Sequence, residues 1–205
     1  VHSELLRRPG KLYVLASHFH PDHFNKEVLQ WREQRPDIIY IFSKNILRHR
    51  RAQKEDAVWL KKGEEYKDET LSVRAFGSTD VGVSFLLQAS GKKIFHAGDL
   101  NNWHWMDEST EAEWKGAEKN FLHELDDLYA YTPEVDVAMF PVDPRLGKEY
   151  MRGAGQFVTK IKTHIFVPMH FTPEYAKANA FRDFAEAHGV RFVSLTHRGQ
   201  KIEIE

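Results

Sequence analysis

The apolar run K-L-Y-V-L-A, residues 11–16, is followed directly by S-H-F-H-P-D-H-F, residues 17–24. A continuous apolar run that ends at polar residues is typical of a buried β-strand. The second stretch holds four metal-binding types of side chain: His18, His20, Asp22 and His23. Imidazole and carboxylate groups are good ligands for divalent metals, and clustering them without a cation to share is unfavourable. The chain must therefore fold so that a buried strand ends at this cluster.

The same arrangement recurs at three other places, where an apolar segment ends in polar side chains. The segments are F-H-A-G-D-L (95–100), V-P-M-H-F (167–171) and A-F-G-S-T-D (75–80), which carry, in that order, Asp99, His170 and the turn residues Ser78, Thr79 and Asp80. Taken singly, a histidine at a strand end more often makes a hydrogen bond, and an aspartate after glycine is often a turn residue. Functional side chains nevertheless favour strand ends, because the sheet fixes the root of each loop. Together the four segments supply a full coordination set, so the sequence predicts a metal site.

The remaining pattern predicts a layered domain. We expect further strands over residues 37–43, 57–60, 70–76, 81–89, 92–97, 135–140, 164–169, 191–195 and 200–205. We expect helices after the N-capping residues Asn25 and Ser43, over 107–128, near 148–162 and after Thr172, Pro173 and Glu174. Short strands in the middle and alternating strands and helices towards the ends indicate sheets covered by helices, an α/β or α+β fold. With no internal repeat, one domain over residues 1–205 is expected.

Composition limits the classes of function. The net charge is −1, so general attraction to nucleic acid or to an acidic membrane surface is not expected. No apolar stretch approaches the roughly 18 residues that span a bilayer, and the N-terminal residues lack the apolar centre of a signal peptide. We therefore expect a cytoplasmic protein with a small-molecule partner, and the oligomeric state stays open. There is no cysteine, so nitrogen and oxygen atoms must hold any metal.

The segment H-F-H-P-D-H resembles the H-x-H-x-D-H signature of the metallo-β-lactamase superfamily. The later segments G-S-T-D-V-G-V-S-F-L-L, I-F-H-A-G-D and V-P-M-H follow in the order of that family. The resemblance implies a four-layer αββα sandwich with metals at one edge of the paired sheets. Members of the family usually open with strands that precede the signature, so we expect those N-terminal strands to be missing from this chain.

The resemblance also implies a ligand set for two metals. His18 and His20 belong to a first site, and Asp99 bridges both sites; the second site is completed by Asp22, His23 and His170. The chain departs from the family at Ser78, where related hydrolases carry a histidine that completes the first site. We therefore expect the second site to bind metal more tightly. Asp80 or His96 could replace the missing donor. Asp80 is preferred, because strand alternation places His96 and Asp99 on opposite faces.

The chemistry that the resemblance implies is hydrolysis by a metal-activated water, with Asp22 and Asp99 orienting the water or accepting its proton. The expected cofactor is one or two divalent ions, zinc first, with manganese and iron as alternatives. The expected substrate is a lactone, an ester or a phosphorylated metabolite, because the C-terminal region is similar to the lactonase-like branch. Two alternatives stay open. One is a metal-binding protein with a degenerate first site and no hydrolase activity. The other is a nuclease, which the neutral charge disfavours.

Two segments beside the expected site are candidates for binding the substrate. W-H-W-M, residues 103–106, places His104 between two tryptophans soon after Asp99. These side chains either grip a ring-shaped compound or pack a helix. The loop P-V-D-P-R-L-G offers Arg145, which either binds a phosphate or carboxylate or lies on the surface.

Overall fold

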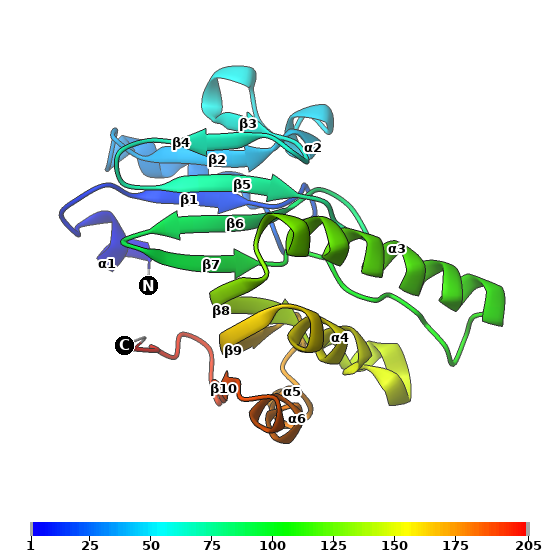
Figure 1. Ribbon diagram of the computed structural model, residues 1–205. Coiled ribbons are helices and arrows are strands. Elements are labelled where there is room, and N and C mark those ends of the chain that lie inside the picture. Colours follow the sequence, from blue (N-terminus) through cyan, green and yellow to red (C-terminus); the bar gives the residue numbers. More distant parts are fainter. Residues whose placement is uncertain (1, 204–205) are drawn as a thin grey trace.

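Two β-sheets pack face to face between two layers of helices in the computed structural model, which describes residues 2–203 and the side chains of residues 4–203 (Figure 1). The smaller sheet has three parallel strands in the order β1 (Tyr13–Ala16), β2 (Ile39–Ser43) and β3 (Val58–Leu60). The larger sheet has seven strands in the order β10-β9-β8-β7-β6-β5-β4. Its strands are β4 (Glu65–Lys67), β5 (Ser72–Phe76), β6 (Ser84–Ala89), β7 (Lys92–His96), β8 (Glu134–Pro141), β9 (Lys162–Met169) and β10 (Arg191–Phe192).

The larger sheet changes character at β7. Strands β4 to β7 pair antiparallel through short turns, whereas β7 to β10 pair parallel and are joined by helical crossovers. Parallel strands need such crossovers, which cover the outer face of the sheet. The helices after β7 are α3 (Glu111–Tyr131), η3 (Pro144–Glu149), α4 (Arg152–Lys160), α5 (Tyr175–Asn179) and α6 (Arg182–Ala187). The smaller sheet is covered by α1 (His2–Leu6), η1 (Lys26–Glu33), α2 (Lys44–Arg48) and η2 (Lys54–Asp56).

Alternation of side chains along the strands builds three core regions. In β2, Tyr40 and Phe42 pack under the helices of the smaller sheet, whereas Ile41 packs between the two sheets. In β7, Phe95 belongs to the core under α3 and α4. The sequence therefore folds into the expected αββα sandwich, because both sheets are apolar on two faces and each face must be covered.

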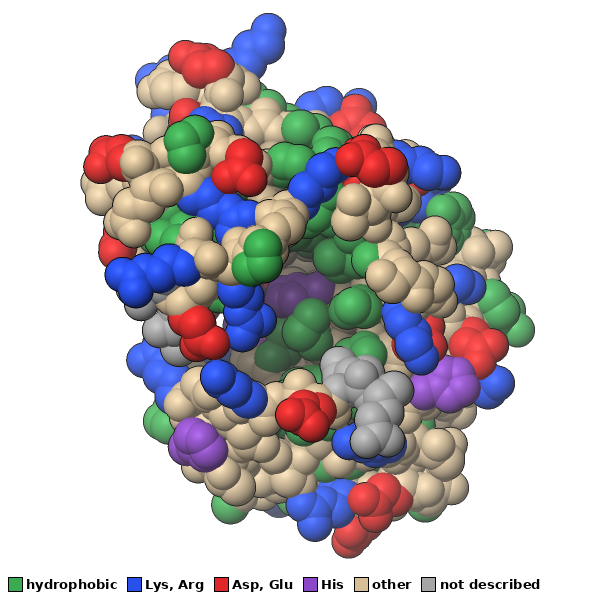
Figure 2. Space-filling model, turned by 90° about the vertical axis from the view of Figure 1, so that its left-hand side faces the viewer, with side chains coloured by type: hydrophobic (Ala, Val, Ile, Leu, Met, Phe, Trp, Pro, Cys, Tyr) green, Lys and Arg blue, Asp and Glu red, His purple; other side chains and the backbone are tan. Residues whose placement is uncertain are grey.

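The inner face of β8 and β9 carries a smaller apolar cluster with Val137 and Ile165. A hollow on the side of the molecule shown in Figure 2 holds hydrophobic side chains and a histidine. Between the sheets lies a pocket of about 180 Å³ that is lined by Leu15, Ser17, Phe85, Leu87, His96 and Met139.

Most of the predicted strands and helices are present but are shorter than predicted, and three predictions need correction. Residues 200–203 form no strand, and the last two residues of that prediction lie outside the described residues. The helix expected near 148–162 is divided into η3 and α4, and β9 already begins at Lys162. The helix expected over 107–128 starts at Glu111, because Thr110 and Glu113 form a capping box there. Strand β4 was not predicted, since its residues E-Y-K are mostly polar. None of the described helices is long and apolar enough to cross a membrane.

Candidate metal centre

The carboxyl ends of β1, β7 and β9 meet at one edge of the sandwich, on the right of Figure 1. The loop that follows β1 is held compactly by the carbonyl of His20, which accepts hydrogen bonds from the backbone N–H groups of His23 (3.0 Å) and Phe24 (2.8 Å). Phe24 is buried in the core under the helices of the smaller sheet. Because the core anchors the end of the loop, its imidazole groups turn towards the sheet edge.

Six of the expected ligands converge at this edge. His18, His20 and Asp99 form one group, and Asp22, His23 and His170 form a second, with the ligand atoms of each group within 4.8 Å of one another. Asp99 lies between the two groups. Its Oδ2 is 3.2 Å from His18 Nε2, while its Oδ1 is 3.0 Å from His23 Nε2 and 3.4 Å from His170 Nε2. This is the arrangement that a bridging carboxylate requires.

The Asp99 carboxylate is suited to a cation. Burial raises its pKa, but the neighbouring imidazole groups of His18 and His23 outweigh burial and hold the pKa well below its usual range. Its Oδ1 is buried, and no described residue offers it a well-aligned hydrogen bond. A buried carboxylate oxygen that faces two imidazole nitrogens without a hydrogen bond is unfavourable unless a cation lies between them. The donor set and this unsatisfied oxygen therefore fit a divalent metal.

Two residues that the sequence did not single out support the histidines. The Ser17 hydroxyl lies 3.0 Å from His18 Nδ1 and 3.3 Å from His23 Nδ1. Asp143 Oδ2 lies 2.9 Å from His170 Nδ1. Partners of this kind fix the ring orientation and leave the Nε2 atoms free to bind metal. Asp143 follows strand β8, so its place at a strand end was a signal that could have been used.

The Asp143 carboxyl is fully buried and carries two partners. It accepts hydrogen bonds from the Arg145 Nε at 3.0 Å and from His170. Burial raises the pKa of Asp143, but the hydrogen bonds from His170 and Arg145 outweigh it and lower the pKa to about 2. Asp143 therefore remains a charged acceptor near neutral pH.

A pocket of about 360 Å³ opens above the ligands. It is lined by His20, Asp22, Thr79, Asp80, Asp99, Trp103, Trp105, Arg145 and His170. Trp103 donates its indole N–H to the backbone carbonyl of Asp99 at 2.8 Å, and its ring lies nearly parallel to that of Trp105. Asp80 and Arg145, expected as an extra donor and as a substrate contact, thus both reach the pocket.

Apart from the six converging ligands, three expected residues do not line this pocket. His104 is buried, with Nε2 3.1 Å from the carbonyl of Glu149 and Nδ1 accepting from the N–H of Met106, which contradicts a role in binding substrate. His96 lines the apolar pocket between the sheets, and burial lowers its pKa to about 4. Ser78 lies in the turn, where Thr79 and Asp80 face the pocket in its place. Strand alternation explains the orientation of His96, and the contacts with Glu149 and Met106 explain the inward orientation of His104.

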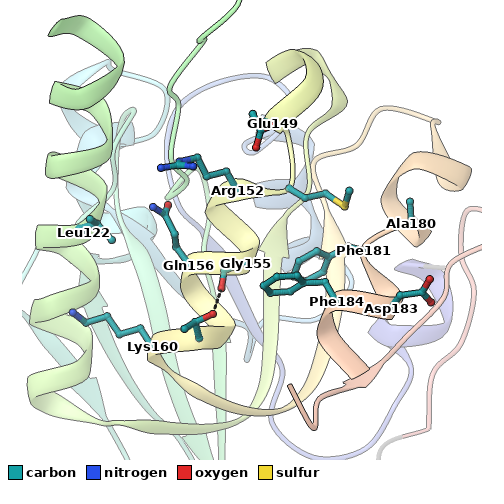
Figure 3. Close-up of a pocket in the computed structure, with 12 residues that line it drawn as sticks. Leu122, Glu149, Arg152, Gly155, Gln156, Lys160, Ala180, Phe181, Asp183 and Phe184 are labelled. Atoms are coloured by element: carbon teal, nitrogen blue, oxygen red, sulfur yellow. Dashed lines mark hydrogen bonds between the residues drawn. The ribbon is translucent and has the colours of Figure 1, made fainter. Parts of the chain in front are cut away.

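A larger pocket of about 740 Å³ lies on the helical side, between α3, α4 and α6 (Figure 3). Its walls include the rings of Phe181 and Phe184. The two cations that line it, Arg152 and Lys160, pair with Glu118 and Asp126. It contains no converging metal-binding groups among the described residues, so the centre at the sheet edge is the candidate functional site.

Comparison with known proteins agrees with this geometry. Residues 4–171 match the family model described as the beta-lactamase superfamily domain. No curated protein matches the sequence.

Several solved structures share the fold at low sequence identity. Igni18, a metallo hydrolase of Ignicoccus hospitalis, is 18% identical with a TM-score of 0.61, covering 90% of this chain and 76% of its own. CmlA, a diiron β-hydroxylase of Streptomyces venezuelae, is 14% identical with a TM-score of 0.59, covering 92% and 44%. Zn(2+)-bound PqqB of Methylobacterium extorquens is 16% identical with a TM-score of 0.53, covering 91% and 73%.

Proposed function

Because the chain belongs to the β-lactamase superfamily, we propose that it is a metal-dependent hydrolase of a small molecule with a lactone, ester or phosphoester bond. The observation that carries this proposal is the convergence of six histidine and aspartate side chains around Asp99. Hydrolases of this kind need cations held at the mouth of a pocket, and the pocket above Asp99 provides that place.

The residues present divide into two metal sites. His18 and His20 would hold one ion and Asp22, His23 and His170 the other, with Asp99 shared between them. When bound, such ions lower the pKa of water from about 15.7 towards about 7 and polarise the bond that is attacked. Zinc is the proposed ion. The same fold holds zinc in PqqB and iron in CmlA, so metal analysis has to decide between them.

The two aspartates have different roles in this proposal. Asp99 stays ionised, because its pKa is held low by His18 and His23, so it positions the site and does not accept protons near neutral pH. The side chain of Asp22 is 69% exposed and lies at the pocket, 3.5 Å from His23 Nε2. Asp22 is therefore placed to accept a proton from water and to pass it to solvent. Trp103 and Trp105 contribute aromatic side chains to the lining of the same pocket.

Metal content and hydrolysis of lactones, esters and phosphoesters test this proposal together. The informative variant is His170→Gln, and the matched control is His164→Gln, an exposed histidine of the strand β9 that ends directly before His170. We expect His170→Gln to lose metal and at least about 100-fold in kcat/KM, while His164→Gln keeps both. Equal hydrolysis by metal-stripped and metal-loaded protein would contradict the proposal.

One observation favours a second candidate, a metal-binding protein without hydrolase activity. The turn after β5 carries Ser78 and offers no imidazole to the group of His18, His20 and Asp99. Asp80→His, which places an imidazole at a turn residue that lines the pocket, is expected to raise the metal stoichiometry towards two ions per chain, with Ser78→His, outside that lining, as the control. An unchanged stoichiometry would indicate that Asp80 or another group already completes the site. Bound metal without hydrolysis of any bond class would favour this candidate.

A further inference from the structure

The pocket above the metal centre has an uneven charge distribution. Asp22, Asp80 and Asp99 line it, and Arg145 is the one lysine or arginine among the described residues of its lining. The carboxylates face the place where cations are expected, so they are matched to the metals. Arg145, as a cation, is not matched to the metals in this way, and its side chain is 55% exposed. A charged group that lines a pocket and remains accessible is a candidate for contact with a ligand.

Arg145 is held rigidly at this place. Its Nε lies 3.0 Å from both carboxylate oxygens of Asp143, and its Nη2 lies 2.6 Å from Asp143 Oδ2. Because the guanidinium group is planar, these bonds fix the direction of the whole group. The Nη1 group makes no hydrogen bond to any residue that the structure describes. Asp143 thus orients the guanidinium and leaves one of its donor groups free.

Arg145 also lies beside the reacting end of the pocket. Its Nη2 is 3.4 Å from His170 Nδ1, and the charges of Asp99 and Asp22 act on it directly. A group bound by Nη1 would therefore lie next to the proposed metals. On the same pocket surface, Trp103 and Trp105 place their rings 6.3 Å apart and nearly parallel, which suits an apolar or ring-shaped part of a ligand.

We propose that Arg145, oriented by Asp143, makes the pocket selective for substrates that carry a negatively charged oxyacid group, carboxylate or phosphate, attached to an apolar or ring-shaped body. This inference rests on the proposed function, because it names the substrate class of the same site. Asp143 partly compensates the charge of Arg145. The higher affinity for an anionic group therefore comes from charge-assisted hydrogen bonds of Nη1 and not from a strong net electric field. A moderate preference of about tenfold is therefore expected.

Three probes that share a phenyl ring test the proposal without any hydrolysis. Benzoate and phenylphosphonate carry the two kinds of oxyacid group, and benzyl alcohol is neutral. Their binding to the metal-loaded protein is measured by calorimetry and by the fluorescence of the pocket tryptophans. Arg145→Gln is the informative variant. Arg74→Gln is the matched control, since Arg74 also pairs with a carboxylate but does not line this pocket.

We expect the wild-type protein to bind at least one anionic probe about tenfold more tightly than benzyl alcohol. Arg145→Gln should remove this preference, leave benzyl alcohol binding and metal content unchanged, and Arg74→Gln should behave like the wild type. The probe that shows the preference identifies the oxyacid group. An anion preference that persists in Arg145→Gln, the absence of any preference in the wild type, or a parallel loss of metal in Arg145→Gln would each overturn the proposal. Failure to hydrolyse any substrate would instead count against the proposed function, because the probes are bound and not cleaved.

Discussion

Asp143 contacts both a proposed metal ligand, His170, and a proposed substrate contact, Arg145, and it fixes the positions of both side chains. It is fully buried, and it accepts hydrogen bonds from His170 on one side and from Arg145 on the other. A buried carboxylate stays ionised when hydrogen bonds satisfy it, and its charge then orients the imidazole that it contacts. A change at this position should therefore be measurable at the metal centre, although Asp143 is not itself among the converging ligand groups.

We expect Asp143→Asn to weaken metal binding by about 10–100-fold, because the amide orients the His170 ring less strongly than the carboxylate. Competition with a chromophoric chelator measures the change. Asp126→Asn, which removes an exposed carboxylate paired with Lys160, is the control and should leave the affinity unchanged. An unaltered affinity in Asp143→Asn would show that His170 is held by packing alone.

At the scale of elements, the site depends on the close approach of three segments, the end of β1 and the loops beside β6 and β7. Gly82 and Gly98 both have positive φ angles, of 79° and 56°. A Cβ atom on Gly82 would lie 2.1 Å from the carbonyl oxygen of Ser17 and 2.5 Å from His18 Cβ. The segments pack backbone to backbone at this point, and that closeness brings His18 to Asp99.

A comparison of Gly82→Ala with Gly91→Ala separates the energetic cost of backbone strain from the cost of disturbing this close packing. Gly91 has a similar φ of 75°, but a Cβ atom added there would have no other atom within 4 Å. Gly91→Ala should therefore cost about 1 kcal/mol of unfolding free energy, from φ alone. Gly82→Ala should cost about 3 kcal/mol or more and also reduce the metal content, because Ser17 and His18 must move. Urea unfolding and metal analysis measure both effects, and equal costs for the two variants would contradict the packing argument.

Strand β7 places His96 in the apolar pocket between the sheets, which predicts a dependence of stability on pH. Burial lowers the pKa of His96 from 6.5 to about 4, so the unfolded chain binds the proton first. The stability contribution of neutral His96 is complete above about pH 6.5 and is lost as the pH falls towards about 4. We expect up to about 2–3 kcal/mol of pH-dependent loss in this range.

Unfolding by urea at pH 7 and at pH 4.5 measures this loss. His96→Asn, which cannot be protonated, should show a smaller loss between the two pH values than the wild type. His188→Asn, at an exposed position, is the control and should follow the wild type. A pH dependence that is the same in His96→Asn would assign the effect to other groups.

At the scale of the whole molecule, the proposed metals would join the two halves of the sandwich. His18, His20, Asp22 and His23 follow the smaller sheet, whereas Asp99 and His170 follow strands of the larger sheet. Ions held by both groups would therefore connect the sheets at one edge. Because the metal ions bind the folded state and not the unfolded chain, metal binding should raise the stability of the entire domain.

We expect removal of metal with a chelator to lower the Tm and re-addition of zinc to restore it. At a free metal concentration of about 100 times the Kd, the stabilisation is about 2.7 kcal/mol. Scanning calorimetry measures the shift, and Asp99→Asn should reduce it strongly. A Tm that does not respond to chelator or zinc would contradict the assignment of a metal centre between the sheets.

Features that depend only on neighbouring residues could be predicted from the amino-acid sequence. Apolar runs of strand length located most strands, the capping residues Asn25 and Ser43 located two helix starts, and the histidine and aspartate residues at strand ends located the six converging side chains. These signals are local, because side-chain alternation and capping act over two to four residues. The order of the motifs then indicated the fold, which the family model confirms.

Which strand-end residues share one pocket depends on how the strands are ordered and packed. His96 and His104 are close to Asp99 in sequence, yet one faces the apolar pocket between the sheets and the other is buried against the carbonyl of Glu149. Asp143 is distant from His170 in sequence but lies next to it in space. The reason is that β8 and β9 are adjacent parallel strands, in which Pro141 pairs with Met169 just before these two residues. Strand order and packing bring together residues far apart in the chain, and no local pattern encodes that order. For this reason the ligands could be predicted from the sequence, whereas the contacts of Asp143 with both His170 and Arg145 could not.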